Sequence, residues 1–256
     1  MMTVLKSVLE RVPAAKRAEG ETPANLWEEW REALQARAKA SGKEEATPEE
    51  PRLGLPGSGS DFAVFVHHLN IPCLEPGFGG GKGGGGYHTT FDDFLYVEKH
   101  VDPGFVGHEL AGTFYAELLA DLADRGAFFD DAEAARELAR RAREAASESS
   151  IAGPLATSFQ RVAESFDKLV EFLGPEQKRT HNVQLRIAKG NLFQSLAVPE
   201  GLAGRSWFRN RLWAPGLEDG YGSETFPSLR AAQAQGQEAL DAETEALVKS
   251  VEFLAL

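Results

Sequence analysis

Large apolar residues recur at a helical period in the second half of the chain. The intervals are four, three, four, three and four residues along the series Leu155, Phe159, Val162, Phe166, Leu169 and Leu173. Such a series lies on one face of an α-helix and packs against neighbouring helices. The pattern predicts a helical bundle over residues 105–256, with further helices over residues 105–125, 131–148, 176–197 and 228–254.

Residues 1–104 mix helical and extended patterns. Apolar residues at helical spacing predict helices over residues 4–12 and 26–40, and Pro13 ends the first of them. Residues 71–78 are predicted to form a short buried strand. This succession is typical of an α/β domain, although too few strands are present for a complete sheet.

Two segments of this first part have the features of a helix start. In one, Ser60 or Asp61 is the expected N-cap, and the side chains expected to point inward are Phe62, Phe65, Val66 and Leu69. His67 and His68 are expected on the surface of that helix.

In the other segment the cap is expected near Thr90 or Asp92, and Pro103 follows the end of the helix. We interpret Asp92 and Asp93 as helix-start charges rather than catalytic acids, because acidic side chains stabilise a helix N-terminus.

A glycine-rich stretch, GGGKGGGG, occupies residues 79–86. A phosphate-binding loop needs the order G-x-x-x-x-G-K-[S/T], and here Lys82 is followed by glycine. A dinucleotide fingerprint needs a preceding strand and a later acidic residue. The match of this stretch to that fingerprint is weak too. We expect a mobile loop that acts as a flap over a cleft, since few contacts hold glycine residues in place.

Charge and cysteine content exclude several classes of function. The formal net charge is -12 and the pI is near 5.1, which argues against nucleic acid as a partner because phosphate binding needs clustered Lys and Arg. Cys73 is the single cysteine, so an intrachain disulfide and a cysteine-based zinc knuckle are both impossible. We expect no membrane segment and no signal peptide in this chain.

Four motifs follow one another: GSGSDFAVFVHHLNIP, YHTTFDDFLYVEKHVDP, RSWFRNRLWAP and YGSETFPS. In this order they resemble the glutamate carboxypeptidase II family of two-zinc peptidases, in which the transferrin receptor is a catalytically inactive member. The resemblance implies a mainly α fold. Residues 1–104 would be the C-terminal remnant of an α/β zinc-exopeptidase domain, and residues 105–256 a transferrin receptor-like helical dimerisation domain.

The resemblance assigns chemistry to the pair Tyr87 and His88. His88 matches the last zinc ligand of the family, and a neutral imidazole is a good ligand for zinc. Tyr87 matches the tyrosine that stabilises the oxyanion of the tetrahedral intermediate, because a phenol can donate to a developing negative charge.

Substrate contacts are also implied. Ser58, Gly59 and Ser60 match a loop that lines the substrate cleft, although Ser60 replaces the usual asparagine. Tyr221 matches the tyrosine that reaches from the helical domain to the substrate carboxylate, and packing at an interface is its alternative role. The lysine that precedes this tyrosine in the family is Gly220 here, so a preference for glutamate-ended substrates is not supported.

The family's earlier zinc ligands and its general base have no counterpart in this sequence. We therefore expect the C-terminal segment of a zinc-dependent exopeptidase that is not catalytic alone and does not bind zinc tightly, because one histidine cannot hold two ions. A peptide would be its substrate once an N-terminal catalytic part completes it. The alternative is a non-catalytic interaction module of transferrin receptor type. We expect a homodimer through residues 105–256, with aromatic anchors at Trp207, Phe208 and Trp213.

Overall fold

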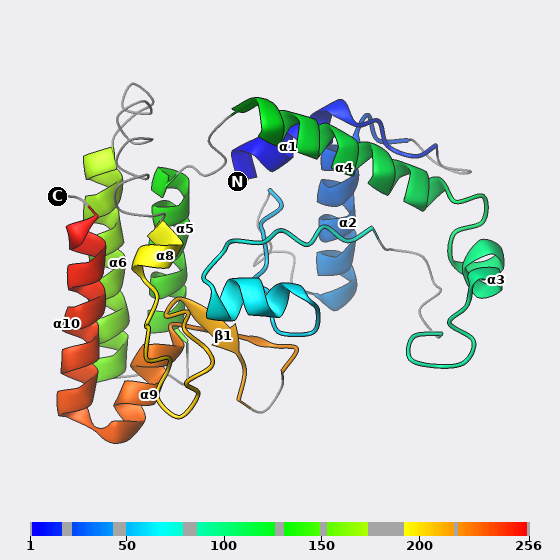
Figure 1. The fold of residues 1–256 in the computed structure, drawn as a ribbon. Helices are drawn as coiled ribbons and strands as arrows, with labels where there is room; N and C mark the ends of the chain where they lie inside the picture. Colours follow the sequence, from blue (N-terminus) through cyan, green and yellow to red (C-terminus); the bar gives the residue numbers. More distant parts are fainter. Residues whose placement is uncertain are drawn as a thin grey trace. The chain divides into compact units, whose positions relative to one another are not determined.

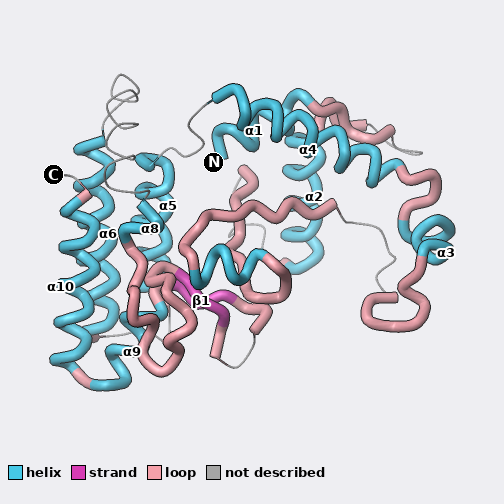
Figure 2. Tube along the Cα trace, viewed as in Figure 1, coloured by secondary structure: helices cyan, strands magenta, loops and turns pink. Residues whose placement is uncertain are grey.

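The computed structural model describes residues 2–16, 22–42, 50–78, 86–125, 131–148, 153–173, 192–217 and 220–254. This part of the chain is mainly helical, as the sequence predicts, with a short β-hairpin (Figure 1, Figure 2). Its backbone forms two compact units. Unit 1 comprises Met1–Leu53 and Glu75–Phe128, and unit 2 comprises Gly54–Leu74 and Phe129–Leu256.

Unit 1 is helical throughout its regular part. Its elements are α1 (Met2–Arg11), α2 (Leu26–Ser41), α3 (Phe94–Tyr96), the π-helix η3 (Val97–Val101) and α4 (Val106–Arg125). Helix α1 packs against both α2 and α4 through a buried face made of Val4, Leu5, Val8 and Leu9. At its C-terminal end, Nη2 of Arg11 lies 3.0 Å from Oδ1 of Asp121 on α4.

Local signals set the helix boundaries in unit 1. The side chain of Asn25 caps α2 at its N-terminus, and Gly42 ends the helix with a left-handed φ of 65°. Asp93 caps α3 by accepting a hydrogen bond from the amide of Tyr96 at 2.8 Å. This confirms the interpretation of Asp93 as a helix-start charge. The cap predicted at Thr90 or Asp92 is wrong, because the cap lies one residue beyond Asp92.

Unit 2 contains the predicted bundle except α4, the helix predicted over residues 105–125, which belongs to unit 1. Its helices are α5 (Asp131–Ala146), α6 (Pro154–Leu173), α8 (Leu192–Ser195), α9 (Pro227–Gln235) and α10 (Gln237–Phe253). Every member of the apolar series on α6 is buried, which confirms the predicted helix face. Helix α5 packs closely on α6 because its buried face is mostly alanine, at Ala132, Ala135, Ala139, Ala142 and Ala145.

A hairpin and a segment from early in the chain complete unit 2. Strand β1 (Trp213–Pro215) pairs with the antiparallel strand β2 (Ser223–Thr225). The π-helix η2 (Val64–His68) is bonded to the chain just before β1, where Nδ2 of Asn210 donates to the carbonyl of Val66 at 3.1 Å. Hydrogen bonding of this kind attaches the early segment to the bundle.

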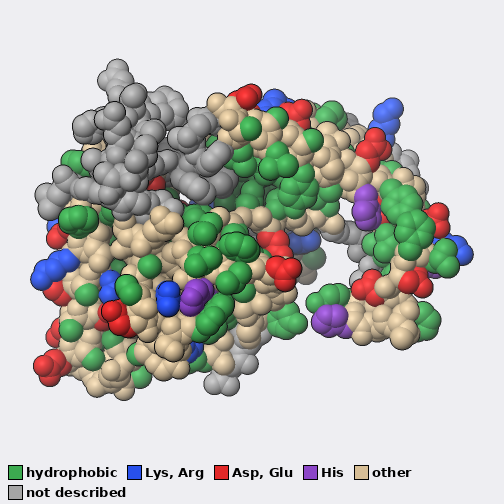
Figure 3. Space-filling view, viewed as in Figure 1, with side chains coloured by type: hydrophobic (Ala, Val, Ile, Leu, Met, Phe, Trp, Pro, Cys, Tyr) green, Lys and Arg blue, Asp and Glu red, His purple; other side chains and the backbone are tan. Residues whose placement is uncertain are grey.

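The side-chain directions predicted for residues 60–69 are partly wrong. Phe65 and Leu69 were expected to point inward but are 45% and 47% exposed, and His67 was expected on the surface but is fully buried. The wider turn of a π-helix changes which side chains share a face, so an α-helical wheel misplaces them. Hydrophobic side chains accordingly reach the surface over this part of unit 2 (Figure 3).

Two further elements of the structure differ from those predicted from the sequence. Residues 71–78 form no strand, and Ile71 is 40% exposed. The helix predicted over 228–254 is broken at Gly236, whose φ of 117° ends α9 and precedes α10. The helix predicted over 176–197 lies mostly outside the described residues, where only α8 is seen within its range.

Candidate functional site

Two of the predicted substrate segments meet in unit 2. The carbonyl of Gly220 accepts hydrogen bonds from the amide of Ser58 at 2.9 Å and from its Oγ at 2.8 Å. Nearby, Oγ of Ser223 donates to the carbonyl of Leu55 at 3.0 Å. These bonds place the Ser58 loop beside the loop that carries Tyr221, although the two are far apart in the sequence.

Two glycines lie in this contact, and the first of them leaves no room for a side chain. A Cβ atom added to Gly57 would lie 2.2 Å from the carbonyl oxygen of Tyr221, and one added to Gly59 would lie 3.0 Å from Cδ1 and Cε1 of the Tyr221 ring. The ring therefore lies against bare backbone while remaining 70% exposed. Ser60 is exposed, and its carbonyl accepts from the amide of Ala63 at 3.1 Å, where the chain turns toward η2.

A histidine that the sequence analysis placed on the surface belongs to this site. His67 is fully buried, and its Nε2 lies 2.6 Å from the carbonyl oxygen of Gly57. Burial lowers the pKa of His67 below its ordinary value of 6.5, outweighing the nearby carbonyls of Gly57 and Trp213, which favour the charged ring. No local pattern predicts a partner ten residues away across a π-helix, so the sequence carries no signal for this role.

Tyr87 and His88 lie in a tight turn of unit 1. Thr89 closes this turn, since its amide and its hydroxyl donate to the carbonyl of Gly86 at 3.0 and 2.7 Å. The two rings stack with centroids 3.8 Å apart, both residues are exposed, and His88 has a left-handed φ of 59°. Residues 79–85 lie outside the described residues, so the glycine flap stays a prediction.

The residues present do not fit a catalytic zinc site by themselves. Across the described ranges there is no group of three or more His, Cys, Asp or Glu side chains arranged to hold a metal ion. A catalytic zinc needs about three protein ligands, and His88 alone offers one. The predicted site residues also fall into two sets: Tyr87 and His88 belong to unit 1, whereas the Ser58 loop and Tyr221 belong to unit 2. No chemical step through zinc follows from this arrangement.

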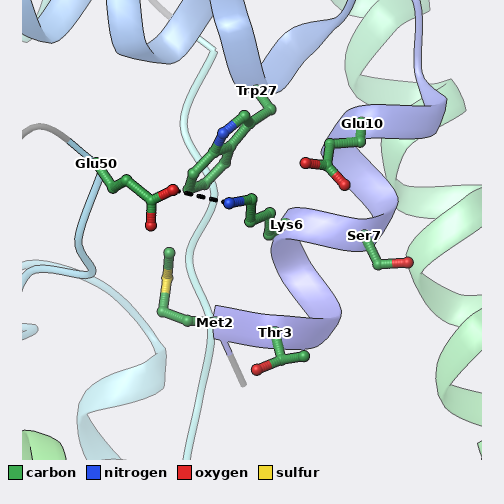
Figure 4. Close-up of a pocket in the computed structure, with 7 residues that line it drawn as sticks. All are labelled: Met2, Thr3, Lys6, Ser7, Glu10, Trp27 and Glu50. Carbon is green, nitrogen blue, oxygen red and sulfur yellow. Dashed lines mark hydrogen bonds and ion pairs between the residues drawn. The ribbon is translucent and has the colours of Figure 1, made fainter.

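Unit 1 carries a separate surface pocket of about 390 Å³, lined by α1, α2 and Glu50 (Figure 4). In it, Nζ of Lys6 lies 2.8 Å from Oε1 of Glu50 and 4.8 Å from the centroid of the Trp27 ring. The hydrogen bond between them raises the pKa of Lys6 and lowers the pKa of Glu50. The ammonium group is already neutralised by Glu50, and the pocket includes none of the predicted site residues.

Comparison with known proteins agrees with the motifs. Residues 154–254, which include α6, α10 and the hairpin, match the family model described as the transferrin receptor-like dimerisation domain. The mouse (Mus musculus) protein named Aminopeptidase NAALADL1 is 31% identical over 212 residues, which is 73% of this chain and 27% of the relative. An Arabidopsis thaliana protein named Probable glutamate carboxypeptidase LAMP1 is 28% identical over 187 residues, covering 70% of this chain and 26% of that relative.

The chain belongs to the glutamate carboxypeptidase and transferrin receptor-like family. It corresponds to the family's C-terminal part and spans about a quarter of the length of the curated relatives it matches. Tyr221 and its loop lie inside the matched dimerisation domain, whereas the Ser58 loop precedes it in sequence. None of the described helices is both long and apolar enough to cross a membrane.

Proposed function

We propose that this chain is the C-terminal segment of a zinc-dependent exopeptidase, carrying the last active-site segment and a dimerisation domain, and inactive alone. The contact between Tyr221 and the Ser58 loop carries this proposal. The family resemblance assigns both segments to the substrate cleft, and two glycines allow their close approach. Relatives named as an aminopeptidase and as probable glutamate carboxypeptidases support the same class of reaction.

The proposed roles follow the chemistry of each side chain. Ser58, Gly59, Ser60 and Tyr221 would contact a peptide substrate, with the exposed Tyr221 hydroxyl suited to donate to a carboxylate. In unit 1, Tyr87 would donate a hydrogen bond to the substrate oxyanion. His88 and Tyr87 are both exposed in their turn and therefore accessible to a complementing polypeptide.

The test compares the chain alone with a reconstituted enzyme. The purified chain should contain no stoichiometric zinc and should not hydrolyse dipeptides. When an N-terminal catalytic part is supplied, His88→Ala should abolish activity, while His100→Ala, which removes another exposed histidine of unit 1, should not. Tyr87→Phe should mainly lower kcat, by roughly a hundredfold or more. Hydrolysis by the chain alone that survives His88→Ala would contradict the proposal.

The second candidate is a non-catalytic dimerisation module, which the match to a dimerisation domain favours. Under this second hypothesis, residues 105–256 form a homodimer. Of the three aromatic anchors expected from the sequence, Trp213 is buried in the core, so it does not serve a partner. Trp207 remains 46% exposed and stacks on His68.

Light scattering at tens of micromolar decides whether the chain self-associates, and a monomer at that concentration would contradict dimerisation in both candidate functions. Trp207→Ala should weaken the dimer if this exposed ring is an anchor, because aromatic anchors contribute much of the binding energy of an interface. Leu217→Ala, which truncates another exposed apolar side chain of unit 2, is the matched control.

A further inference from the structure

The imidazole of His67 has a defined tautomer. Its Nε2 lies 2.6 Å from the carbonyl oxygen of Gly57, and a carbonyl oxygen can only accept a hydrogen bond. Nε2 must therefore carry the proton. Because the ring is fully buried and its pKa is lowered by burial, the neutral form that donates through Nε2 predominates at neutral pH.

The chain that leads into β1 also contacts His67, through its backbone and through its ring. The backbone carbonyl of His67 accepts from the amide of Arg209 at 2.7 Å, and the ring packs edge-on against Phe208 with centroids 5.9 Å apart. The positive charge of Arg205 acts against protonation of the imidazole. The Nε2–H donor of His67 is thus oriented by contacts that do not involve the Gly57 loop itself.

The loop that receives this bond lies directly against the backbone of Tyr221. Gly57 lies so close to the Tyr221 backbone that a side chain at this position would overlap its carbonyl oxygen. The next residue, Ser58, donates its amide to the carbonyl of Gly220. A shift of the Gly57 carbonyl would therefore move the backbone on which the Tyr221 loop depends.

We propose that His67 is a positioning residue: its Nε2–H holds the Gly57 carbonyl, and this bond sets the Ser58 loop and Tyr221 in their relative places. The importance of this arrangement for substrate rests on the function proposed above. The bond itself does not, because it acts within unit 2 and needs neither zinc nor a substrate.

The test uses two substitutions that differ in hydrogen-bonding ability. His67→Gln retains an N–H donor that can reach the Gly57 carbonyl, whereas His67→Leu fills similar space without a donor. The readout is hydrogen exchange of the Ser58 amide, followed by NMR in the full chain. We expect roughly tenfold faster exchange in His67→Leu and near-normal exchange in His67→Gln, since leaving the partly buried Gly57 carbonyl unpaired favours local opening.

His68→Gln is the matched control. The neighbouring imidazole is bonded through Nδ1 to the carbonyl of Trp207 at 2.7 Å, outside the Gly57 loop. This control should leave Ser58 exchange unchanged. Equal protection of the Ser58 amide in His67→Leu and in the wild type would overturn the proposal, because a purely packing role predicts that result.

A measurement on the wild type covers the case in which His67→Leu does not fold. Ring ¹⁵N chemical shifts should identify His67 as neutral and protonated at Nε2 at pH 7. A ring protonated at Nδ1, or a charged ring, would overturn the proposal.

Activity measured in the reconstituted enzyme then separates the positioning of the loop by His67 from the role of that loop in substrate binding. A raised KM with retained kcat in His67→Leu would support the role in substrate positioning. Faster Ser58 exchange with unchanged KM would overturn the substrate role of this loop while leaving the positioning of the loop by His67 established.

Discussion

The carbonyl oxygen of Gly220 accepts two hydrogen bonds from Ser58, one from the amide at 2.9 Å and one from the hydroxyl at 2.8 Å. The bonded groups are separated by 162 positions in the chain. Because the two donors are different groups of one residue, the hydroxyl can be removed without changing the backbone bond.

Ser58→Ala should loosen this junction. The variant keeps the amide bond and loses the hydroxyl bond, so the free energy of unfolding should fall by roughly 0.5–1.5 kcal/mol, which is typical of one hydrogen bond. Urea unfolding measures the change. Ser60→Ala, two residues away and exposed, is the control and should be close to neutral. An equal loss in both variants would argue against a specific role for the Ser58 hydroxyl.

Gly57→Ala should be the most disruptive change in the loop. Its Cβ would lie 2.2 Å from the carbonyl oxygen of Tyr221, so the backbone must shift, at a cost of about 1–3 kcal/mol in the free energy of unfolding. Gly54→Ala is the matched control, because a Cβ at that position meets no atom within 4 Å. Thermal unfolding compares the two variants, and equal melting temperatures would show that the loop does not need glycine at position 57.

Asp102 should make the start of α4 sensitive to acid. Its carboxylate accepts from the amides of Gly107 and His108, each at 3.0 Å, and from Nδ1 of His108 at 2.6 Å. The Gly107 amide and the His108 ring are the main causes that hold the pKa of Asp102 at about 2, below its ordinary 3.8. A lowered carboxyl pKa stabilises the folded state fully above pH 3.8, and this contribution is lost as the pH falls through about 2.

Asp102→Asn should therefore lower the melting temperature near neutral pH, and the difference from the wild type should shrink between about pH 4 and pH 2. Calorimetry across this range tests the sign. Asp92→Asn removes a nearby exposed carboxylate and is the control. A difference that grows as the pH falls would contradict the assignment.

Phe159→Ala should severely destabilise unit 2. The ring is fully buried on α6 and packs against Phe226 with centroids 5.8 Å apart, while the guanidinium of Arg230 lies 5.4 Å from its centroid. Removing a buried phenylalanine leaves a cavity and typically costs about 3–5 kcal/mol. Gln160→Ala changes the adjacent exposed position and should be nearly neutral in the same denaturant titration. A loss below about 1 kcal/mol for Phe159→Ala would mean that the bundle repacks around the gap.

The helices were predictable because their signals are local. The apolar period from Leu155 to Leu173 specifies the buried face of α6, since every interval is close to one helical turn. The end of α1 near Pro13 likewise depends on a residue close in the sequence. The N-cap at Asp93 is also a local feature, although the sequence analysis expected it at Thr90 or Asp92. The family motifs identified the segments of the candidate site for the same reason, because each is a short continuous stretch.

By itself, then, the sequence determined the mainly α fold, the apolar face of α6 and the segments that carry the candidate site. The tertiary structure alone decided that His67 is buried, that its partner is Gly57, and that the Ser58 loop meets Tyr221. It also decided that Phe65 faces solvent, because η2 is a π-helix whose turn differs from the α-helical period. The physical reason is the range of the interaction: helical periodicity and capping act over a few residues, whereas a hydrogen bond between distant segments exists only after both have packed into one unit.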